Sequence, residues 1–348
     1  MKPVFRIVAD GHDITALIND RLLSASTTDK PGIDSDDFEL RLDDRDGALT
    51  LPSRGANIAV YLGWESDRLT LLGRYTVDEI EVSGPPDTVV IRSKSSDTRS
   101  SAKTTRDGSW EGVPLSSIVA DIAKRNGWIP ECPVDTLVER VDQLGESDLN
   151  FINRLAKLHD CTAKVADGKL LVLPRQAGKS ASGKDLPKVT IRRSDVSRWQ
   201  FRLGDDNVKS AVKASYQDDK GKLVTVEVGN EATPDGLPPV HTDRHIHANK
   251  SAAEAAAKAR LAGFNRSTAG VRLEMPGRTD LFAESEIDAR EFKEGLDGSY
   301  LVDSVQQVWT QAGWSTTVEC NGGKKGKADA KGKKKQKAPL KVVDLSAQ

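Results

Sequence analysis

Residues 145–174 constrain the fold most tightly, because a helical pattern is followed there at once by a hairpin pattern. The apolar side chains that share one side of the predicted helix are Leu149, Phe151, Ile152, Leu155, Ala156 and Leu158. Its opposite arc carries Asn150, Asn153, Arg154 and Lys157. Ser147 suits the N-cap, and Asp167-Gly168 is the preferred pair for a tight turn between two strands. The segment therefore predicts a helix that lies on another layer and leads into a β-hairpin.

The preceding part of the chain is typical of a β-domain. Short runs rich in β-branched and aromatic residues occur at 4–8, 38–42, 58–62, 69–80 and 88–93. Turn signals separate these runs, among them Asp46-Gly47 and the Gly-Pro-Pro of residues 84–86. Strands at this spacing favour a barrel or a sandwich, and we place this first β-domain at residues 1–104.

Residues 105–175 form a predicted small α/β module. Between residues 114 and 126 the apolar positions follow a helical period, with Pro114 suited to the first turn and Gly127 to the position after the last. The helix and hairpin of residues 145–174 complete this module. Residues 176–187 (QAGKSASGKDLP) are polar and rich in Gly, Ser and Lys, which predicts a linker.

A second β-domain is predicted at residues 188–322. Strand patterns recur at 189–192, 197–203, 210–217, 223–228, 270–275 and 299–319. Between them Ser251 and Glu254 match a capping box before an alanine-rich helix that runs to about Phe264. The fold class is therefore mainly β with an α/β insertion.

Charge divides the chain into an acidic body and a basic tail. Residues 323–348 hold nine lysines and two aspartates, whereas the remainder holds 42 basic and 50 acidic residues. The tail has almost no large apolar side chains before Leu340, so we expect it to be disordered. Three scattered cysteines argue against a disulfide framework, and neither a signal peptide nor a membrane-spanning run is recognisable. These features favour synthesis in a cytosol and no membrane partner.

Catalytic and cofactor motifs are missing from the sequence. It contains no nucleophile elbow, zinc-protease motif or phosphate loop, so we expect no catalytic residue and no cofactor. His241, His245 and His247 are the weak candidates for a metal site, since their spacing matches no standard ligand pattern. Exposed histidines in a loop or strand are the favoured reading, and on a strand His245 and His247 would share a face.

The lysine tail offers a rival function, that of nucleic-acid binding or regulation. Lysine runs neutralise phosphates without reading sequence, and this tail lacks the arginines and aromatics that base recognition uses. A solvated tail is the simpler interpretation, with anchoring to an acidic partner surface as the alternative. The interaction candidates in the tail are Lys324, Lys325, Lys333, Lys334 and Lys335.

Four segments in order carry a family resemblance. The helix-plus-hairpin motif ESDLNFINRLA…DGKL, the opening GHDIT…DFELRLDD, the strands NIAVYLGW and LLGRYTVDEIEV, and the closing hairpin GSYLVDSVQQVWTQAGWSTTVEC occur in register. Together they resemble the late control D family, the tail-hub proteins of contractile phages, and the hub part of type VI secretion spike proteins. The resemblance covers most of residues 1–320.

The resemblance implies two β-barrel hub domains per chain and a homotrimeric ring with a pseudo-sixfold face. Its implied partners are a trimeric spike, a hexameric tail tube, the tape-measure protein and other baseplate proteins, with DNA only passing through the channel. The implied location is the virion baseplate or a phage-tail-like particle. Because the chain ends in a lysine tail soon after the hub-like strands, we expect the spike to be a separate polypeptide. A complete phage and a tail-like bacteriocin or injection machine both remain open.

Tryptophans outside the obvious alternation are candidates for ring contacts, because interfaces favour this residue. They are Trp64, Trp110, Trp128, Trp309 and Trp314. Packing in the core is the commoner fate of such residues, and Trp309 and Trp314 are placed to meet across the final hairpin.

Overall fold

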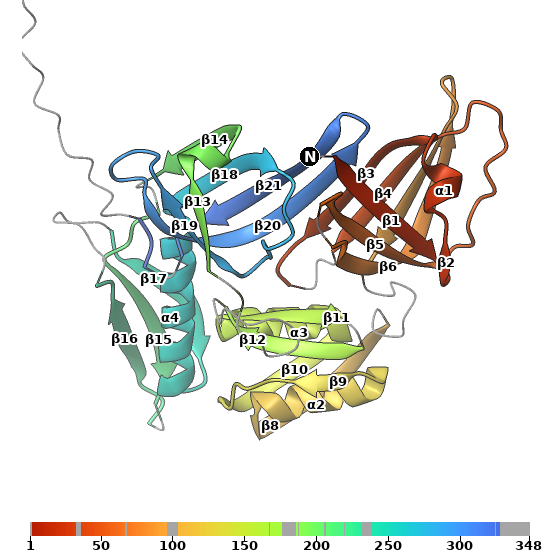
Figure 1. Cartoon of the computed structure of the whole chain (residues 1–348). Helices are drawn as coiled ribbons and strands as arrows, with labels where there is room; N and C mark the ends of the chain where they lie inside the picture. Colours follow the sequence, from red (N-terminus) through yellow and green to blue (C-terminus); the bar gives the residue numbers. More distant parts are fainter. Residues whose placement is uncertain are drawn as a thin grey trace, which may run out of the picture.

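The computed structural model of the chain is built mainly from β-strands, with a helical module at one side (Figure 1). The structure describes residues 2–32, 36–66, 68–95, 104–166, 168–175, 186, 188–204, 207–218, 220–231, 239–323 and 325–327. Within this part, no helix is long and apolar enough to cross a membrane. The predicted fold class, mainly β with an α/β insertion, is confirmed.

The N-terminal β unit surrounds one hydrophobic core. Its elements are β1 (Pro3–Ala9), β2 (His12–Asp13), α1 (Thr15–Ile18), β3 (Leu22–Asp29), β4 (Asp37–Asp43), β5 (Asn57–Trp64), β6 (Thr70–Ser83) and β7 (Thr88–Lys94). Alternate residues of these strands point inward, as Phe38, Leu40 and Leu42 do along β4. The five strands predicted for this part of the chain are therefore confirmed.

The α/β module packs two helices against short strands. Its elements are β8 (Thr105–Pro114), α2 (Leu115–Asn126), β9 (Ile129–Glu131), β10 (Leu137–Ser147), α3 (Asp148–Leu158), β11 (Cys161–Ala166) and β12 (Lys169–Pro174). The predicted caps hold: the Ser147 hydroxyl accepts from the Asn150 amide, and Gly127 adopts φ +70° after α2. Phe151 of α3 stacks on Trp110 of β8, with 5.0 Å between their ring centroids. The apolar side of the predicted α3 helix thus faces the module's own core.

The C-terminal β unit is interrupted by a helix-backed insert. The unit comprises β13 (Val189–Arg192), the 3₁₀ turn η2 (Arg193–Asp195), β14 (Arg198–Leu203), β18 (Ala269–Pro276), β19 (Glu286–Arg290), β20 (Gly298–Thr310) and β21 (Gly313–Asn321). The insert comprises β15 (Ala211–Gln217), β16 (Leu223–Gly229), β17 (His241–His247) and α4 (Lys250–Arg266). Small side chains such as Ala253 and Ala257 let α4 pack closely on Val212 and Ala214 of β15.

The predicted capping box of α4 is wrong. Asn249 is the N-cap, and its side-chain oxygen accepts from the Ala252 amide at 2.7 Å, while Ser251 lies inside the first turn. Asn caps helices as well as Ser does, so the earlier residue begins the helix. Glu254 instead lies 3.8 Å from Lys250, one turn back.

The two β units share one continuous sheet, so the prediction of two separate closed barrels is not confirmed. Strand order runs β14-β18-β21-β20-β3-β4-β7-β6-β5-β1-β2, and β19 joins β13 to β20. The joint is the antiparallel pair of β20 with β3, from Val305 opposite Asp29 to Thr310 opposite Ser24. This pairing joins segments far apart in the chain, and local sequence patterns do not predict such contacts. In Figure 1 the sheet passes from the blue strands to the red ones without a break.

The tryptophans proposed for interfaces lie mostly inside. Trp110, Trp309 and Trp314 are buried, while Trp64 and Trp128 are partly buried against the cores. Trp309 and Trp314 are register partners across the final hairpin, as the sequence suggested. The side chain that sequence reasoning missed is Trp199, which is 40% exposed.

Candidate assembly surface

One face of the shared sheet is polar across eight neighbouring strands. Its composition follows from strand alternation, because the opposite side chains fill the two cores. A single row of register partners crosses from β14 to β6 through Arg198, Glu274, Thr317, Gln306, Thr28, Asp37, Lys94 and Thr76. Every member of this row is polar, so a continuous hydrophilic row crosses both β units. We call this surface the polar face.

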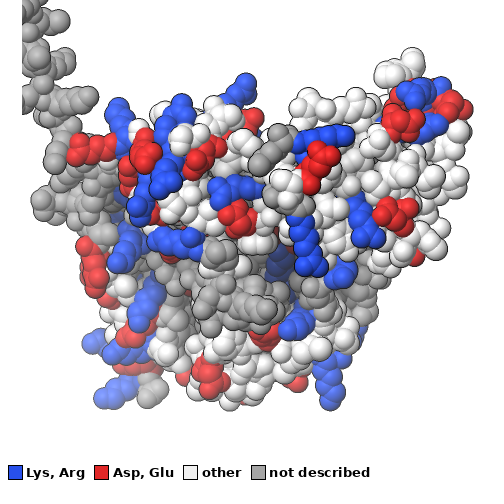
Figure 2. Space-filling model, in the orientation of Figure 1, with Lys and Arg blue, Asp and Glu red and all other residues white. Residues whose placement is uncertain are grey.

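Charges on the polar face are largely paired. Arg272 lies 2.6 Å from Glu319 on the neighbouring strand. Arg92 of β7 contacts Glu39 at 3.2 Å and Glu81 at 2.8 Å, which links three strands. Figure 2 shows the same interspersion of Lys and Arg with Asp and Glu on the side of the molecule it presents. Paired charges of both signs leave such a surface strongly hydrated without a large field of one sign.

β14 forms an open end of the sheet. It pairs with β18, and no other described strand pairs with its outer edge. The strand is exposed along almost all of its length and carries Arg198 and Arg202 on the polar face. On its other side Trp199 packs edge-on against Phe292, with 5.9 Å between ring centroids. An unpaired edge with exposed apolar side chains is a ready template for another strand.

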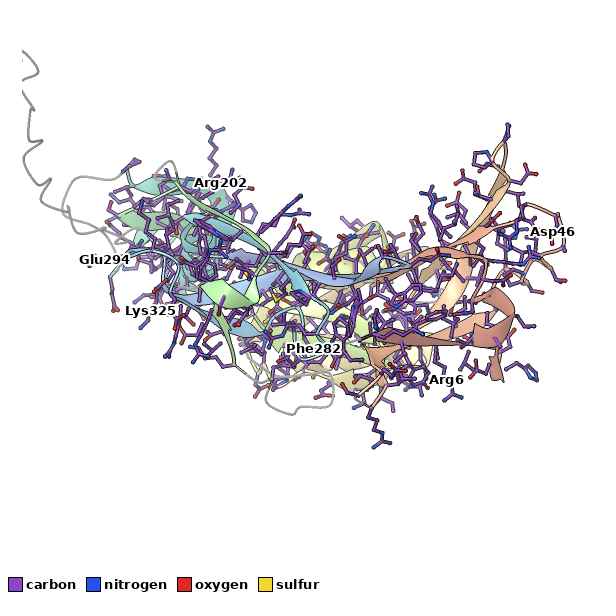
Figure 3. The ribbon with its side chains drawn as sticks, turned by 45° about the horizontal axis from the view of Figure 1, so that its top comes forward. Arg6, Asp46, Arg202, Phe282, Glu294 and Lys325 are labelled. Carbon is purple, nitrogen blue, oxygen red and sulfur yellow. The ribbon has the colours of Figure 1, made fainter. Side chains whose placement is uncertain are left out.

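A second open edge lies at the far end of β6. This strand is 14 residues long, and its first half pairs with β5 as far as Thr76. Residues 78–83 pair with β7 alone among the described strands. Asp78, Glu79 and Glu81 make this edge acidic, whereas the β14 edge is basic. Figure 3 shows Arg202 of β14 and Asp46 of the N-terminal unit toward opposite ends of the molecule.

Asp29, at the end of β3, joins three parts of the chain. Its Oδ1 lies 3.1 Å from the Lys164 ammonium of the α/β module. Its Oδ2 accepts from the Ala283 amide of the C-terminal β unit at 2.8 Å. Asp36 contacts the same ammonium at 2.9 Å. The module is therefore fixed to both β units through one carboxylate junction.

The junction carries more negative than positive charge. Burial, with the neighbouring charge of Asp29, raises the pKa of Asp36 to about 6, although Lys164 acts in the opposite direction. Two carboxylates share one ammonium, and the Lys30 amide also donates to Asp36. The Asp36 carboxyl consequently titrates nearer to neutrality than an exposed aspartate does.

The three candidate histidines all lie on β17 but do not converge. His245 and His247 have ring centroids 4.9 Å apart, so the two share a side as predicted for a strand, while His241 packs on Phe264. His247 Nε2 lies 3.6 Å from Asp243. Burial, then the charge of His245, lowers the pKa of His247. Among the described residues no three His, Cys, Asp or Glu side chains are grouped to hold a metal ion.

Most of the lysine tail lies outside the residues that the structure describes. Lys324, Lys333, Lys334 and Lys335 lie outside the described residues, as do the rest of residues 328–348 and most of the 176–187 linker. Lys325 is described and exposed. Just after it, the Lys327 amide donates to Thr268 and the Lys327 ammonium lies 4.3 Å from the Tyr300 ring centroid. The root of the tail is thus held beside the C-terminus of α4.

Comparison with known protein families gives one match over most of the chain. The model of the family described as "Phage tail baseplate hub (GPD)" matches residues 35–313. A probable baseplate hub protein of Escherichia phage P2 is 31% identical, over 92% of this chain and 93% of its own length. Its counterpart in Escherichia phage 186 is 30% identical over 92% of both chains.

Solved structures share the fold at low identity. The tail protein from Neisseria meningitidis MC58 superposes with a TM-score of 0.70 at 12% identity, over 95% of this chain and 99% of that one. An Escherichia coli protein described as a component of the type VI secretion system gives 0.55 at 12% identity, over 86% of this chain and 73% of that one.

Proposed function

Because this chain belongs to the phage tail baseplate hub family, we propose that three copies form the ring that joins the tail tube to the central spike. The chain is a baseplate hub protein of a phage tail, and its role is structural. The observation that carries the ring proposal is the shared sheet with its open edges at β14 and at the far end of β6.

The pairing of β20 with β3 within one chain suggests how strands of two neighbouring chains could pair. The C-terminal unit contributes four strands in the order β14-β18-β21-β20, and the N-terminal unit continues with β3-β4-β7-β6. Within one chain, the last strand of the first set pairs with the first strand of the second set. Pairing β6 of one copy with β14 of the next repeats this relationship. A head-to-tail contact of this kind closes into a ring when the rotation allows it.

Charge supports the same contact. The free part of β6 carries Asp78, Glu79 and Glu81, three acids that share Arg92 and Lys94 of β7, and the free edge of β14 carries Arg198 and Arg202. Opposite charges across paired strands stabilise the pair and select its register. Two alternating β units in each of three copies would give the ring a pseudo-sixfold face that matches a hexameric tube.

In this arrangement the polar face lines the channel. Its paired charges and hydroxyl side chains would keep the described part of this surface hydrated, which discourages adhesion of passing DNA or tape-measure protein. The threefold side would hold a trimeric spike, with other baseplate proteins bound around the ring. We place the protein in the virion baseplate of a contractile tail or in a tail-like particle.

The proposal also includes the domain boundaries. Residues 1–104 and 188–322 are assigned as two hub domains, each completed by its neighbours, with residues 105–175 as the module, 176–187 as a linker and 323–348 as the tail. The module has its own hydrophobic cluster and most of each β unit's buried side chains cluster together, which supports this division, although Trp309 and Trp314 of the second unit pack in the core of the first.

Electron microscopy of the purified protein, alone and with its spike, tests the ring. We expect closed rings with a central opening and six similar lobes around one face. Particles with only two lobes, the size of one chain, both with and without the spike would overturn the proposal.

A further inference from the structure

A cleft of about 850 Å³ lies between α3 of the module and α4 of the insert. The polar arc that the sequence predicted for α3 forms one wall, including Asn150, Asn153 and Lys157. The facing wall is α4, where Ala256 and Ala259 leave the space open. Clefts of this size commonly bind ligands, and none of its lining residues belongs to the polar face or to β6 and β14.

Several hydrogen-bond donors in the cleft have no partner within the described part of the chain. Lys157 of α3 and Arg260 of α4 are both exposed. Lys157 makes no hydrogen bond or ion pair with described residues, whereas the charge of Arg260 helps to lower the pKa of Asp243. The side-chain amides of Asn150 and Asn153 stand beside them, also without such a bond. Facing helices therefore present an excess of unused donors and positive charge to the same space.

One of the donors is buried. The His247 side chain is 9% exposed, and its Nε2 atom faces Asp243 Oδ2 at 3.6 Å, a distance that leaves room for a closer acceptor. Both acids of the cleft have partners. Glu146 contacts Arg154 at 2.8 Å, and Asp243 accepts from the His245 amide, faces His247 and is stabilised by the charge of Arg260.

We propose that the cleft between α3 and α4 binds an acidic segment of a partner polypeptide, with its carboxylates received by Lys157 and Arg260. Carboxylates match these cations and amides as acceptors, and the exposed Leu158 gives the segment's aliphatic stems an apolar contact. A single-stranded nucleic acid fits less well, because it needs open aromatic faces for stacking. The Phe264 ring in the cleft is covered by His241 and by Lys209.

The test uses a fluorescently labelled hexaglutamate peptide and the full chain, with anisotropy as the readout. We expect the reversals Lys157→Glu and Arg260→Glu each to weaken binding about fivefold, the effect of one ion pair. Ala256→Leu, which fills the cleft without changing charge, should weaken binding at least as much. Lys124→Glu, in the last turn of α2, and Lys258→Glu on α4 are matched controls that should change affinity less than about twofold.

Two results would overturn this proposal. One is hexaglutamate binding that is undetectable or responds equally to the control reversals, which would reflect surface charge alone. The other is tighter binding of labelled hexathymidylate that depends on Lys157 and Arg260, which would assign the cleft to nucleic acid. The assembly mass of every variant is measured in parallel. A variant that loses peptide binding but keeps the mass of the ring, or the reverse, separates this inference from the ring proposal.

Discussion

Lys164 of the α/β module places its ammonium 3.1 Å from Asp29 of the N-terminal β unit, across 135 positions of sequence. The module and the β units have separate hydrophobic clusters, so polar contacts of this kind hold them together. Asp29 also binds the Ala283 amide, and Thr162 donates to Glu284 beside it. The junction therefore fixes how the module projects from the sheet.

Removing the ammonium should weaken this junction. Lys164→Met keeps the aliphatic stem but leaves two carboxylates facing each other, and we expect the free energy of unfolding to fall by about 2 kcal/mol. Urea denaturation measures the change. Lys124→Met, at an exposed position on α2, is the control and should have little effect. Equal stability of the two variants would show that the junction contributes nothing.

Asp36 should make stability depend on pH. Its pKa is raised to about 6, above the ordinary value of 3.8, so the folded state binds this proton more tightly than the unfolded state. The resulting stabilisation is present below about pH 4 and is lost as the pH rises through about 6. We compare the wild type with Asp36→Asn, which cannot titrate. The wild type's stability relative to this variant should fall by roughly 2 kcal/mol between pH 4 and pH 7. A constant difference, or one that rises with pH, would contradict the assignment.

Gly277 should not tolerate a side chain. An added Cβ would lie 1.9 Å from the Trp314 ring, and the Gly277 carbonyl accepts from the Trp64 indole at 2.9 Å. We expect Gly277→Ala to lower the free energy of unfolding by about 2 kcal/mol or more, because the Trp314 indole must move to make room for the added methyl group. Gly229→Ala is the matched control, since nothing lies within 4 Å of its Cβ position. Equal melting temperatures for the two variants would argue against this close packing.

The proposed contact between copies should respond to exchanged charges. Reversal of Arg198 and Arg202 to Glu should weaken assembly, and so should reversal of Glu79 and Glu81 to Lys. Mixing the two variants restores opposite charges at the mixed joint, so assembly should recover there. Sedimentation velocity measures each case. If the mixture assembles no better than either variant alone, the β6–β14 pairing is not the contact.

Sequence patterns predicted the local structure well. Ser147 and Gly127 bound their helices as predicted, because caps and periodicity are set by neighbouring residues. The resemblance that carried the hub assignment is borne out by the family match over residues 35–313. At α4 the predicted cap, Ser251, was wrong, because Asn249 caps the helix two residues earlier.

Non-local contacts could not be predicted in the same way. The Ser- and Thr-rich β3 strand gives no sign that it pairs with β20, so the shared sheet was missed and two closed barrels were expected. Lys164 and Asp29 are ordinary charged residues in the sequence, and only the fold brings them together. The α3–α4 cleft likewise combines a predicted polar arc with an alanine face from a distant helix.

Light scattering of the purified chain, alone and with its cognate spike, tests the central claim most directly. The account predicts a particle of three times the chain mass of 37.7 kDa that binds one spike trimer, or a monomer that trimerises when the spike is added. A particle that stays monomeric with and without the spike would contradict it.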